Sequence, residues 1–357
     1  MAIENARLFG QMRAENRRLH REVEGRFKEV IGSSPVMRRI HQVMVGVLNN
    51  DSTVLLTGES GTGKGMVARA IHANGQRQQG PFIAVDCGAL PENLLEAELF
   101  GYRRGAFTGA DQDRTGLVEE ARGGTLFLDE IGNTSPGLQA RLLRLLQEKE
   151  IRRLGENETR PVNVRIIAAT NADLRSLMQE GKFRQDLFYR LNVVSIEVPP
   201  LRSRLEDLTA LVDHFLRRHT PQGSQAKRLG PGVLRAFGQY SWPGNVRELE
   251  HVIERLLLLT PGEFITLDDL PDDLRPTDVE PSLSDGHAET RSSRKRTGPR
   301  SVDSPKTGEQ LMIEDALRRY AGDKAKAARF IGWNRQKLYR RMRSFGIPAA
   351  FGRKKAA

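Results

Sequence analysis

Gly58-Glu-Ser-Gly-Thr-Gly63-Lys64 is the stretch that decides the fold of this 357-residue chain. It follows an apolar run, Val54-Leu55-Leu56, and precedes a helical pattern over Met66–Ala73. Glycines in such a loop let the backbone wrap a phosphate, while backbone N–H groups and the helix N-terminus supply positive partial charge. Strand, glycine loop and helix in this order predict a nucleotide site made of Gly58, Glu59, Ser60, Gly61, Thr62, Gly63, Lys64 and Gly65.

Short β-branched runs alternate with longer helical patterns between Ile31 and Ile196. The expected strands are Thr53–Thr57, Phe82–Asp86, Thr125–Asp129, Arg165–Thr170 and Val193–Val198. Strands separated by helices predict an α/β fold with a parallel sheet and crossover connections. From Leu205 to Leu270 the strand signal disappears, and a smaller helical domain is expected there. Its helices are Leu208–His219, Pro231–Tyr240 and Val246–Leu259.

Composition divides the chain into five parts. Residues 1–25 have the pattern of a charged helix, residues 26–200 form the nucleotide-binding part, and residues 201–275 form the helical part. Residues 276–308 contain scattered prolines among small and charged residues, which is typical of a flexible linker. Helical periodicity returns in residues 309–357, which predicts a separate all-α domain.

The net charge of +11 is confined to one end. Residues 291–357 carry 19 Lys or Arg against 5 Asp or Glu, whereas the rest of the chain carries 37 against 40. Such an asymmetry indicates a C-terminal element that faces a polyanion, most plausibly nucleic acid. A solvated basic tail is the alternative, and the helical periodicity of this segment argues against it. The run Arg294-Lys-Arg296 is interpreted as part of the solvated linker.

Several protein classes are excluded by what the chain lacks. Its one cysteine, Cys87, excludes an internal disulfide framework and a cysteine-rich zinc site, and it fits a reducing cytoplasm. No apolar run approaches the roughly 18 residues of a membrane span, and the N-terminus has no apolar signal core. A cytoplasmic protein without a membrane partner is therefore expected.

The strand Thr125–Asp129 ends in two adjacent acids, Asp129 and Glu130. Asp129 can hold Mg²⁺ through water, and Glu130 can polarise an attacking water. Alone, such a pair is more often a solvated strand end, but downstream of a P-loop it favours ATP hydrolysis. The hydroxyl that follows the lysine in most P-loops is missing, because Gly65 stands there. Magnesium would therefore depend more on water and on Asp129.

Four further polar residues are candidates for the reaction. Asn171, at the end of the next strand, would sense the γ-phosphate or the attacking water, and the alternative is that it caps the following helix. Arg184 and Arg190 would act as arginine fingers on the nucleotide of a neighbouring copy, and the alternative is a surface salt bridge. Arg247, near the start of a lid helix, would reach back to the phosphates.

These motifs together resemble the AAA+ domain of bacterial enhancer-binding proteins, the activators of the sigma-54 form of RNA polymerase. The deciding segment is the family's signature hexapeptide, which stands intact as Gly105, Ala106, Phe107, Thr108, Gly109 and Ala110. Its two glycines free the backbone for a tight protrusion, and Phe107 and Thr108 offer a small amphipathic tip. By composition alone, an ordinary turn with a tucked phenylalanine would be the simpler interpretation.

The resemblance covers roughly residues 26–345. It implies a ring, a hexamer, that binds ATP between subunits, with Arg184 and Arg190 acting in trans. It also implies that hydrolysis moves the 105–110 loop against sigma-54 and remodels the closed promoter complex. Two residues depart from the family: Gly65 stands where Glu is usual, and Asp86 where Asn often couples the Walker B glutamate to the loop. An ionised Asp86 cannot donate an amide N–H.

Glu309–Gly346 resembles the Fis-type helix-turn-helix that closes many members of this family. Its helices are expected over Leu311–Tyr320, Lys324–Ile331 and Asn334–Ser344, with Leu338, Met342 and Phe345 on the buried face of the third. We expect Arg335 and Gln336 to meet base edges, and the other cations mainly phosphates. The predicted DNA-binding residues are Asn334, Arg335, Gln336, Lys337, Arg340 and Arg341.

Two other functions stay open at this point. An AAA+ unfoldase or DNA-remodelling motor would share the nucleotide site but not the hexapeptide. A non-catalytic DNA-binding regulator would result if Gly65 and Asp86 had removed turnover. The first residues, Ala2–Phe9, resemble the closing helix of a GAF sensory domain, which implies a fragment or a protein without its sensor.

Overall fold

The computed structural model describes residues 27–221 and 227–275, together with single residues between Ile313 and Ile347. The chain divides into two units, Met1–Pro281 and Ser282–Ala357. The predicted helix over residues 1–25 and the predicted linker over residues 276–308 lie outside the described residues. Across the described part of the chain, no helix combines the length and apolar character needed to cross a membrane.

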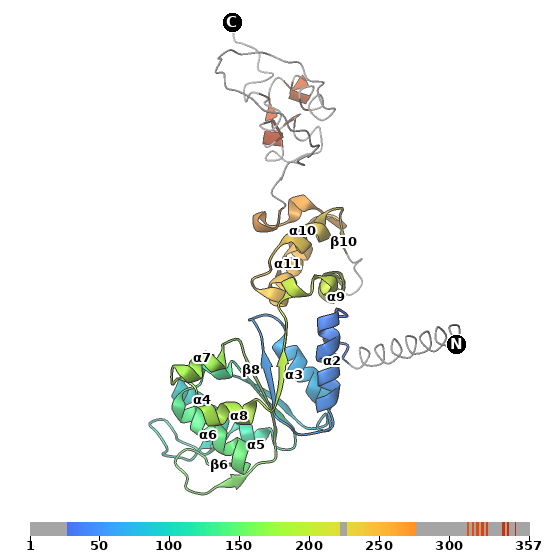
Figure 1. Cartoon of the computed structure of the whole chain (residues 1–357). Coiled ribbons are helices and arrows are strands. Elements are labelled where there is room, and N and C mark those ends of the chain that lie inside the picture. The colour runs from blue at the N-terminus through green and yellow to red at the C-terminus, as the bar shows by residue number, and fades with distance from the viewer. Residues whose placement is uncertain are drawn as a thin grey trace, which may run out of the picture. The chain divides into compact units, whose positions relative to one another are not determined.

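A five-stranded parallel sheet forms the centre of the first unit (Figure 1). Its order is β2-β5-β8-β1-β9, so the P-loop strand lies between two later strands. The strands are β1 (Val54–Thr57), β2 (Phe82–Asp86), β5 (Thr125–Asp129), β8 (Arg165–Thr170) and β9 (Val194–Glu197). All five predicted strands are confirmed, within one residue at each end. The α/β prediction is therefore correct.

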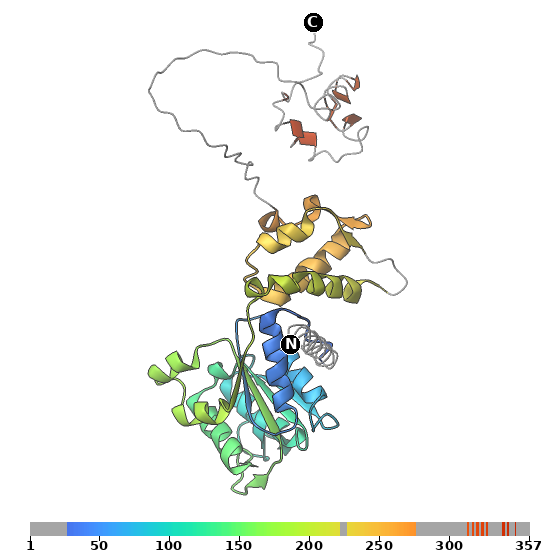
Figure 2. The same ribbon diagram turned by 45° about the vertical axis from the view of Figure 1, so that its right-hand side comes forward.

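Helices cover both faces of this sheet (Figure 2). On β1, Leu55 packs against one helical layer, while Val54 and Leu56 pack against the other, as the alternation of side chains along a strand requires. One layer contains α2 (Pro35–Val47) and α3 (Lys64–Ala73). The other contains α4 (Glu92–Phe100), α5 (Leu117–Glu120), α6 (Pro136–Glu148), α7 (Leu174–Gln179) and α8 (Gln185–Leu191).

The lid packs around Trp242 and Phe237, whose rings meet edge to face. Its helices are α9 (Leu208–His219), α10 (Val233–Gln239) and α11 (Asn245–Leu259). The expectation that this region has no strands is wrong, because β10 (Arg228–Leu229) pairs with β11 (Phe264–Ile265). Two residues are too few to produce a periodic pattern. The same holds for the pairs β3 (Gly101–Tyr102) with β4 (Arg114–Thr115) and β6 (Glu150–Ile151) with β7 (Arg160–Pro161).

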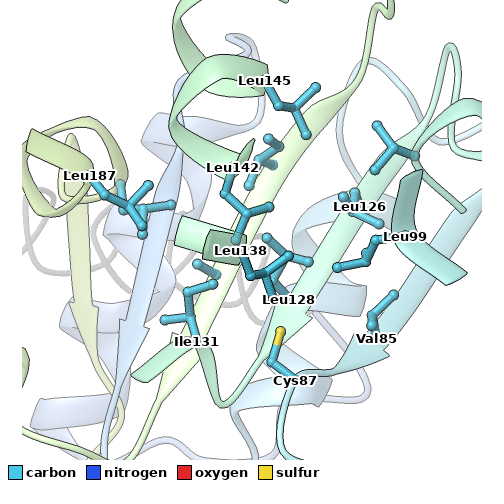
Figure 3. Packing of buried hydrophobic residues seen from close by; sticks show 14 of the residues in the cluster. Val85, Cys87, Leu99, Leu126, Leu128, Ile131, Leu138, Leu142, Leu145 and Leu187 are labelled. Atoms are coloured by element: carbon cyan, nitrogen blue, oxygen red, sulfur yellow. The ribbon is translucent and has the colours of Figure 1, made fainter. Parts of the chain in front are cut away.

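Cys87 follows β2 and lies in the apolar cluster between the sheet and helices α4 and α6. Figure 3 shows its side chain directed into this cluster beside Leu128. Burial, followed by the nearby carboxylates, raises the pKa of the thiol to about 12. The thiol is therefore protonated at neutral pH, and its contribution is packing.

We expect Cys87 to react with iodoacetamide at pH 8 about fiftyfold more slowly than an unfolded thiol. The raised pKa reduces the thiolate fraction roughly a thousandfold, and the greater nucleophilicity of a more basic thiolate offsets part of that loss. The rate should rise about tenfold per pH unit between pH 7 and 9, since thiolate increases with pH. Mass spectrometry of the labelled protein, with a urea-unfolded sample as reference, measures this. Rapid labelling of the folded protein at pH 8 would contradict it.

A buried polar cluster joins the lid to the α/β part. Asp207 is 1% exposed, and its Oδ1 accepts the backbone N–H groups of Ser33 at 2.7 Å and Ser34 at 2.8 Å, while its Oδ2 accepts the Ser34 hydroxyl at 2.7 Å. The neighbouring Arg204 donates Nη2 to the carbonyl of Thr62 in the P-loop at 2.9 Å. Desolvation lowers the pKa of Arg204, and Asp207 opposes that change. The start of α2, the P-loop and the lid therefore share one hydrogen-bonded junction.

Replacing Asp207 with Asn should lower the free energy of unfolding by about 2 kcal/mol. The amide keeps the shape, and its oxygen can still accept the two N–H groups, but it leaves the buried Arg204 without a compensating charge. It also turns the oxygen that accepts the Ser34 hydroxyl into a donor. Urea unfolding followed by circular dichroism measures the change. Asp213→Asn, on the exposed side of α9, is the matched control and should remain within about 0.5 kcal/mol of the wild type. Equal stabilities for the two variants would refute this role.

Candidate active site

The predicted glycine loop connects β1 to α3 and lines a cavity of about 410 Å³. Gly63 has φ 101° and Gly61 has φ 77°, which is the left-handed region that favours glycine. At Gly61 a Cβ would also lie 2.2 Å from the carbonyl oxygen of Gly244 in the lid. The loop therefore needs glycine there both for its turn and for contact with the lid. The cavity is also lined by Lys64, Asp129, Glu130, Arg204 and Arg247.

Lys64 is buried at the start of α3, and its Nζ donates to the carbonyls of Gly58 at 2.9 Å and Glu59 at 3.2 Å. Burial lowers the pKa of this ammonium, while Glu130 and Asp129 raise it. Two acids and the loop carbonyls therefore support a desolvated cation at the cavity. Phosphate oxygens can replace these carbonyls as acceptors of the ammonium hydrogens.

Two of the predicted loop residues, Gly58 and Glu59, are not among the described residues that line this cavity, and their contact with the nucleotide stays a prediction. Gly58 packs against the end of β9, because a Cβ there would lie 2.4 Å from the carbonyl oxygen of Val198. The Glu59 carboxylate accepts from Arg202 at 2.8 Å and from Asn245 at 3.2 Å. These bonds lower its pKa to about 2 and keep it ionised at neutral pH. Glu59 therefore joins the loop to the lid.

Asp129 and Glu130 stand at the carboxyl end of β5, on the edge of the sheet that holds the glycine loop. Glu130 adopts φ 52°, and its N–H donates to Asp129 Oδ1 at 3.0 Å. Its Oε2 accepts the backbone N–H of Asn171, the residue after β8, at 3.2 Å. The structure thus brings both acids and Asn171 together across two adjacent strands.

The donor set around Asp129 suits Mg²⁺, which takes one or two carboxylates together with substrate phosphates and waters. The described residues contain no group of three or more His, Cys, Asp or Glu side chains that could hold a metal by themselves. Gly65 adds no hydroxyl, although its position is open, since a Cβ there would lie 3.8 Å from Phe127. Asp129 is therefore the protein ligand that fits, with water and phosphate completing the shell.

The alternative interpretation of Asn171 as a helix cap is wrong. Helix α7 begins at Leu174, and its cap is Asp173, which accepts the N–H of Arg175 at 2.9 Å. The Asn171 side chain is exposed and lies outside the cavity lining in the part of the chain that the structure describes. Asn171 is linked to the site by the bond from its backbone N–H to the Glu130 carboxylate.

The two predicted finger arginines are exposed at opposite ends of α8. Arg184 precedes the helix and donates to Asp186 at 3.0 and 2.7 Å, as the salt-bridge interpretation expects. Arg190 lies in the last turn. Among the described residues, those that line the cavity include neither of them. Within one chain they are not part of the nucleotide site.

Arg247 reaches the glycine loop from the lid, and its predicted contact with the phosphates stays a prediction. Its Nη1 donates to the Ser60 hydroxyl at 3.1 Å, and its backbone N–H donates to the Gly61 carbonyl at 3.2 Å. Sequence reasoning assigned no role to Asn245, Arg204 and Asp207, which complete this contact. The signal available for the last two was a charged stretch, Arg202 to Asp207, at the predicted domain boundary.

The signature hexapeptide forms the turn between β3 and β4. Gly105 and Gly109 have φ 82° and 101°, and the Gly105 N–H donates to the Ala110 carbonyl at 2.8 Å, which closes the loop. Phe107 is 42% exposed and meets the Tyr102 ring edge to face at 5.0 Å. Ala110 is 5% exposed and belongs to the base of the loop, and its contact with sigma-54 stays a prediction.

Most predicted DNA contacts lie outside the described residues, namely Asn334, Arg335, Gln336, Lys337 and Arg340, as does the predicted core residue Phe345. Arg341 is described and is helical. Leu338 and Met342 are buried, as predicted for the third helix. The described core of this unit consists of Ile313, Ala316, Leu317, Ala327, Leu338, Met342 and Ile347.

Comparison with known proteins agrees with this architecture. Residues 30–197 match the Sigma-54 interaction domain, residues 202–286 the AAA+ ATPase lid domain, and residues 306–345 the Fis family of bacterial regulatory proteins. The chain is 40% identical to regulatory protein AtoC of Escherichia coli (strain K12), over 98% of this chain and 75% of that protein. It is 46% identical to transcriptional regulatory protein ZraR of Salmonella typhimurium, over 87% of this chain and 67% of that protein.

A solved structure shares both the fold and detectable sequence similarity. The crystal structure of NtrX from Brucella abortus in complex with ATP aligns with a TM-score of 0.65 at 31% identity, covering 96% of this chain and 75% of that one. The three domain matches occur in the predicted order, and the relatives align over most of the chain. The chain therefore belongs to the sigma-54-dependent transcriptional activators, a family that joins an AAA+ ATPase domain to a Fis-type helix-turn-helix.

Proposed function

We propose that ATP hydrolysis in this cavity moves the 105–110 loop against sigma-54 and remodels the closed promoter complex. The observation that carries the proposal is the loop itself. Phe107 stands exposed between two glycines in left-handed conformations, in the same α/β part as the nucleotide cavity. A large exposed aromatic on a glycine-hinged turn fits a partner surface, and it can change position at low conformational cost.

The residues that line the cavity have different roles in the proposed reaction. Lys64 and the loop N–H groups bind the terminal phosphates, and Glu130 orients and polarises the attacking water. Asp129 would hold Mg²⁺ through water, and the metal would neutralise charge on the phosphate oxygens. Arg247 ties the lid to the loop that binds the phosphates.

A second copy of the chain would complete the site. Arg184 and Arg190 are exposed and lie outside the cavity of their own chain, as residues that act on a neighbour's nucleotide must. An arginine supplied in trans stabilises charge in the transition state for phosphoryl transfer. We therefore infer a ring, a hexamer, with ATP between its subunits. In such an assembly Arg184 would exchange Asp186 for a phosphate oxygen.

The basic C-terminal domain would hold this assembly on upstream enhancer DNA in the bacterial cytoplasm, where the polymerase is found. Its excess of cations predicts an affinity that falls steeply with salt. Arg335 and Gln336 would supply sequence discrimination, and Lys337, Arg340 and Arg341 the phosphate contacts.

The test is reconstitution with purified sigma-54 RNA polymerase on a promoter that carries the upstream site. We expect open complexes with ATP and none with a non-hydrolysable analogue, together with a shift to ring-sized masses when nucleotide is bound. Open complexes without hydrolysis, or ATP turnover that leaves the promoter closed under every condition, would count against the proposal. Mass measurement with and without nucleotide separates failed assembly from failed coupling.

A further inference from the structure

Asn245, the first residue of α11, has an unusual environment for an amide. It is 0% exposed and adopts φ 55°, the left-handed region that L-residues other than glycine seldom enter. The preceding residue, Gly244, provides no side-chain cap for α11, and the Asn245 side chain bonds to Leu201, Glu59 and Ser60, which all lie outside its own helix. A strained backbone persists where surrounding contacts fix it.

Those contacts join α11 to two other segments of the chain. Asn245 Oδ1 accepts the backbone N–H of Leu201, where the lid begins, at 2.9 Å. Its Nδ2 donates to the Ser60 carbonyl at 3.0 Å and to the Glu59 carboxylate at 3.2 Å. One side chain thus connects the first residue of the lid, a helix of the lid and the phosphate loop. The amide uses both of its N–H donors and one acceptor site, which a carboxylate of the same shape cannot do.

We propose that Asn245 is a positioning residue for ATP binding, holding the phosphate loop in its binding conformation. In a planar trans peptide the carbonyl and the following N–H point in opposite directions. Holding the Ser60 carbonyl toward the lid therefore turns the N–H of Gly61 away from it, on a residue that lines the cavity. The bond from the Arg247 N–H to the Gly61 carbonyl fixes the next peptide in the same way.

The negative charge of Glu59 favours an amide over a carboxylate at position 245. Glu59 also accepts from Arg202, and it is ionised at neutral pH. An aspartate at position 245 would retain the bond to Leu201 and tolerate the left-handed backbone as asparagine does. It would, however, place a second carboxylate beside Glu59 and the Ser60 carbonyl. If the role of Asn245 is purely structural, Asn245→Asp should retain more nucleotide affinity than Asn245→Gly. If Asn245 positions the phosphate loop, Asn245→Asp should retain less.

The experiment measures the Kd of the fluorescent analogue mant-ADP and the steady-state KM and kcat for ATP. Asn245→Gly should raise both Kd and KM about tenfold, and Asn245→Asp at least about twentyfold, with kcat changed less than about threefold, because the loop binds ground state and transition state alike. The double variant Glu59→Gln/Asn245→Asp exchanges the amide and the carboxylate. It should recover at least fivefold of the affinity that Asn245→Asp loses.

Tyr240→Phe is the matched control, because it removes a 3.0 Å bond to Glu248 within the lid and none to the loop. It should leave Kd and KM within about twofold of the wild type. A folded Asn245→Asp protein with affinity within threefold of the wild type, or a double variant no better than Asn245→Asp, would overturn the proposal. If Asn245→Asp does not fold, Asn245→Gly provides the test. An unchanged Kd of mant-ADP in that variant would overturn the proposal. The proposal rests on nucleotide binding alone, so its failure would leave the proposed contact with sigma-54 untouched.

Discussion

Glu130→Gln should reduce kcat for ATP hydrolysis about a thousandfold while ATP still binds. The amide occupies the same space at the end of β5 and can keep accepting the N–H of Asn171, but it cannot take a proton from water or polarise it. A loss of this size, about 4 kcal/mol of transition-state stabilisation, matches the removal of one group that acts only in the transition state. Phosphate release in steady state measures the change.

The matched control is Glu120→Gln, an exposed acid at the end of α5, which should leave kcat within about twofold of the wild type. Binding of mant-ATP must be retained by Glu130→Gln, since Lys64 and the glycine loop are unchanged. Turnover near the wild-type rate would assign water activation to another group. Loss of nucleotide binding would instead indicate that Glu130 supports the loop through Lys64, whose pKa it helps to raise.

The α/β part was predictable from sequence because each of its signals is local. A run such as Arg165–Thr170 is buried along its whole length, so its middle, Ile166–Ala169, is apolar on both faces of the sheet and does not alternate. The glycine loop is equally local, since Gly61 and Gly63 take the left-handed φ values that such a turn demands. The pair Asp129 and Glu130 follows from one strand end. Each of these features depends on neighbours in the chain.

The contact between loop and lid was not predictable in the same way. Asn245 meets Ser60 across 185 residues, and Asp207 meets Ser34 across 173. No periodicity links such positions, and an asparagine at the start of a helix has an ordinary explanation as a cap. Glu59 was assigned to the nucleotide because it lies within the loop sequence, and its partners Arg202 and Asn245 show that its carboxylate faces the lid.

Asp86 is the second residue at which this sequence departs from the family pattern. Asp86 Oδ1 accepts the N–H of Gly88 at 2.8 Å, a bond that an asparagine oxygen could also accept. Asp and Asn at position 86 can therefore form the same turn. They differ in that Asp lacks the amide N–H donor. An ionised Asp86 therefore lacks the donor that coupling between Glu130 and the 105–110 loop is expected to need.

Phe107→Ala should abolish open-complex formation by sigma-54 polymerase, a loss of at least about a thousandfold, while ATPase activity stays within about twofold. Phe107 lies on the protruding turn and is not among the described residues that line the cavity. Removing an exposed aromatic anchor deletes the centre of a partner contact, and such residues dominate interface energies. The turn should survive, because its closing bond joins the backbones of Gly105 and Ala110.

Phe264→Ala is the matched control, because Phe264 is also an exposed phenylalanine, 51% accessible, but lies on β11 of the lid. It should leave promoter melting intact, which separates the loss of one aromatic from the loss of this contact. Permanganate footprinting of the promoter and phosphate release from the same reactions give both readouts together. Full melting by Phe107→Ala would remove the loop from the mechanism, whereas loss of ATPase and melting together would show that Phe107 supports the nucleotide site, contrary to its place in the fold.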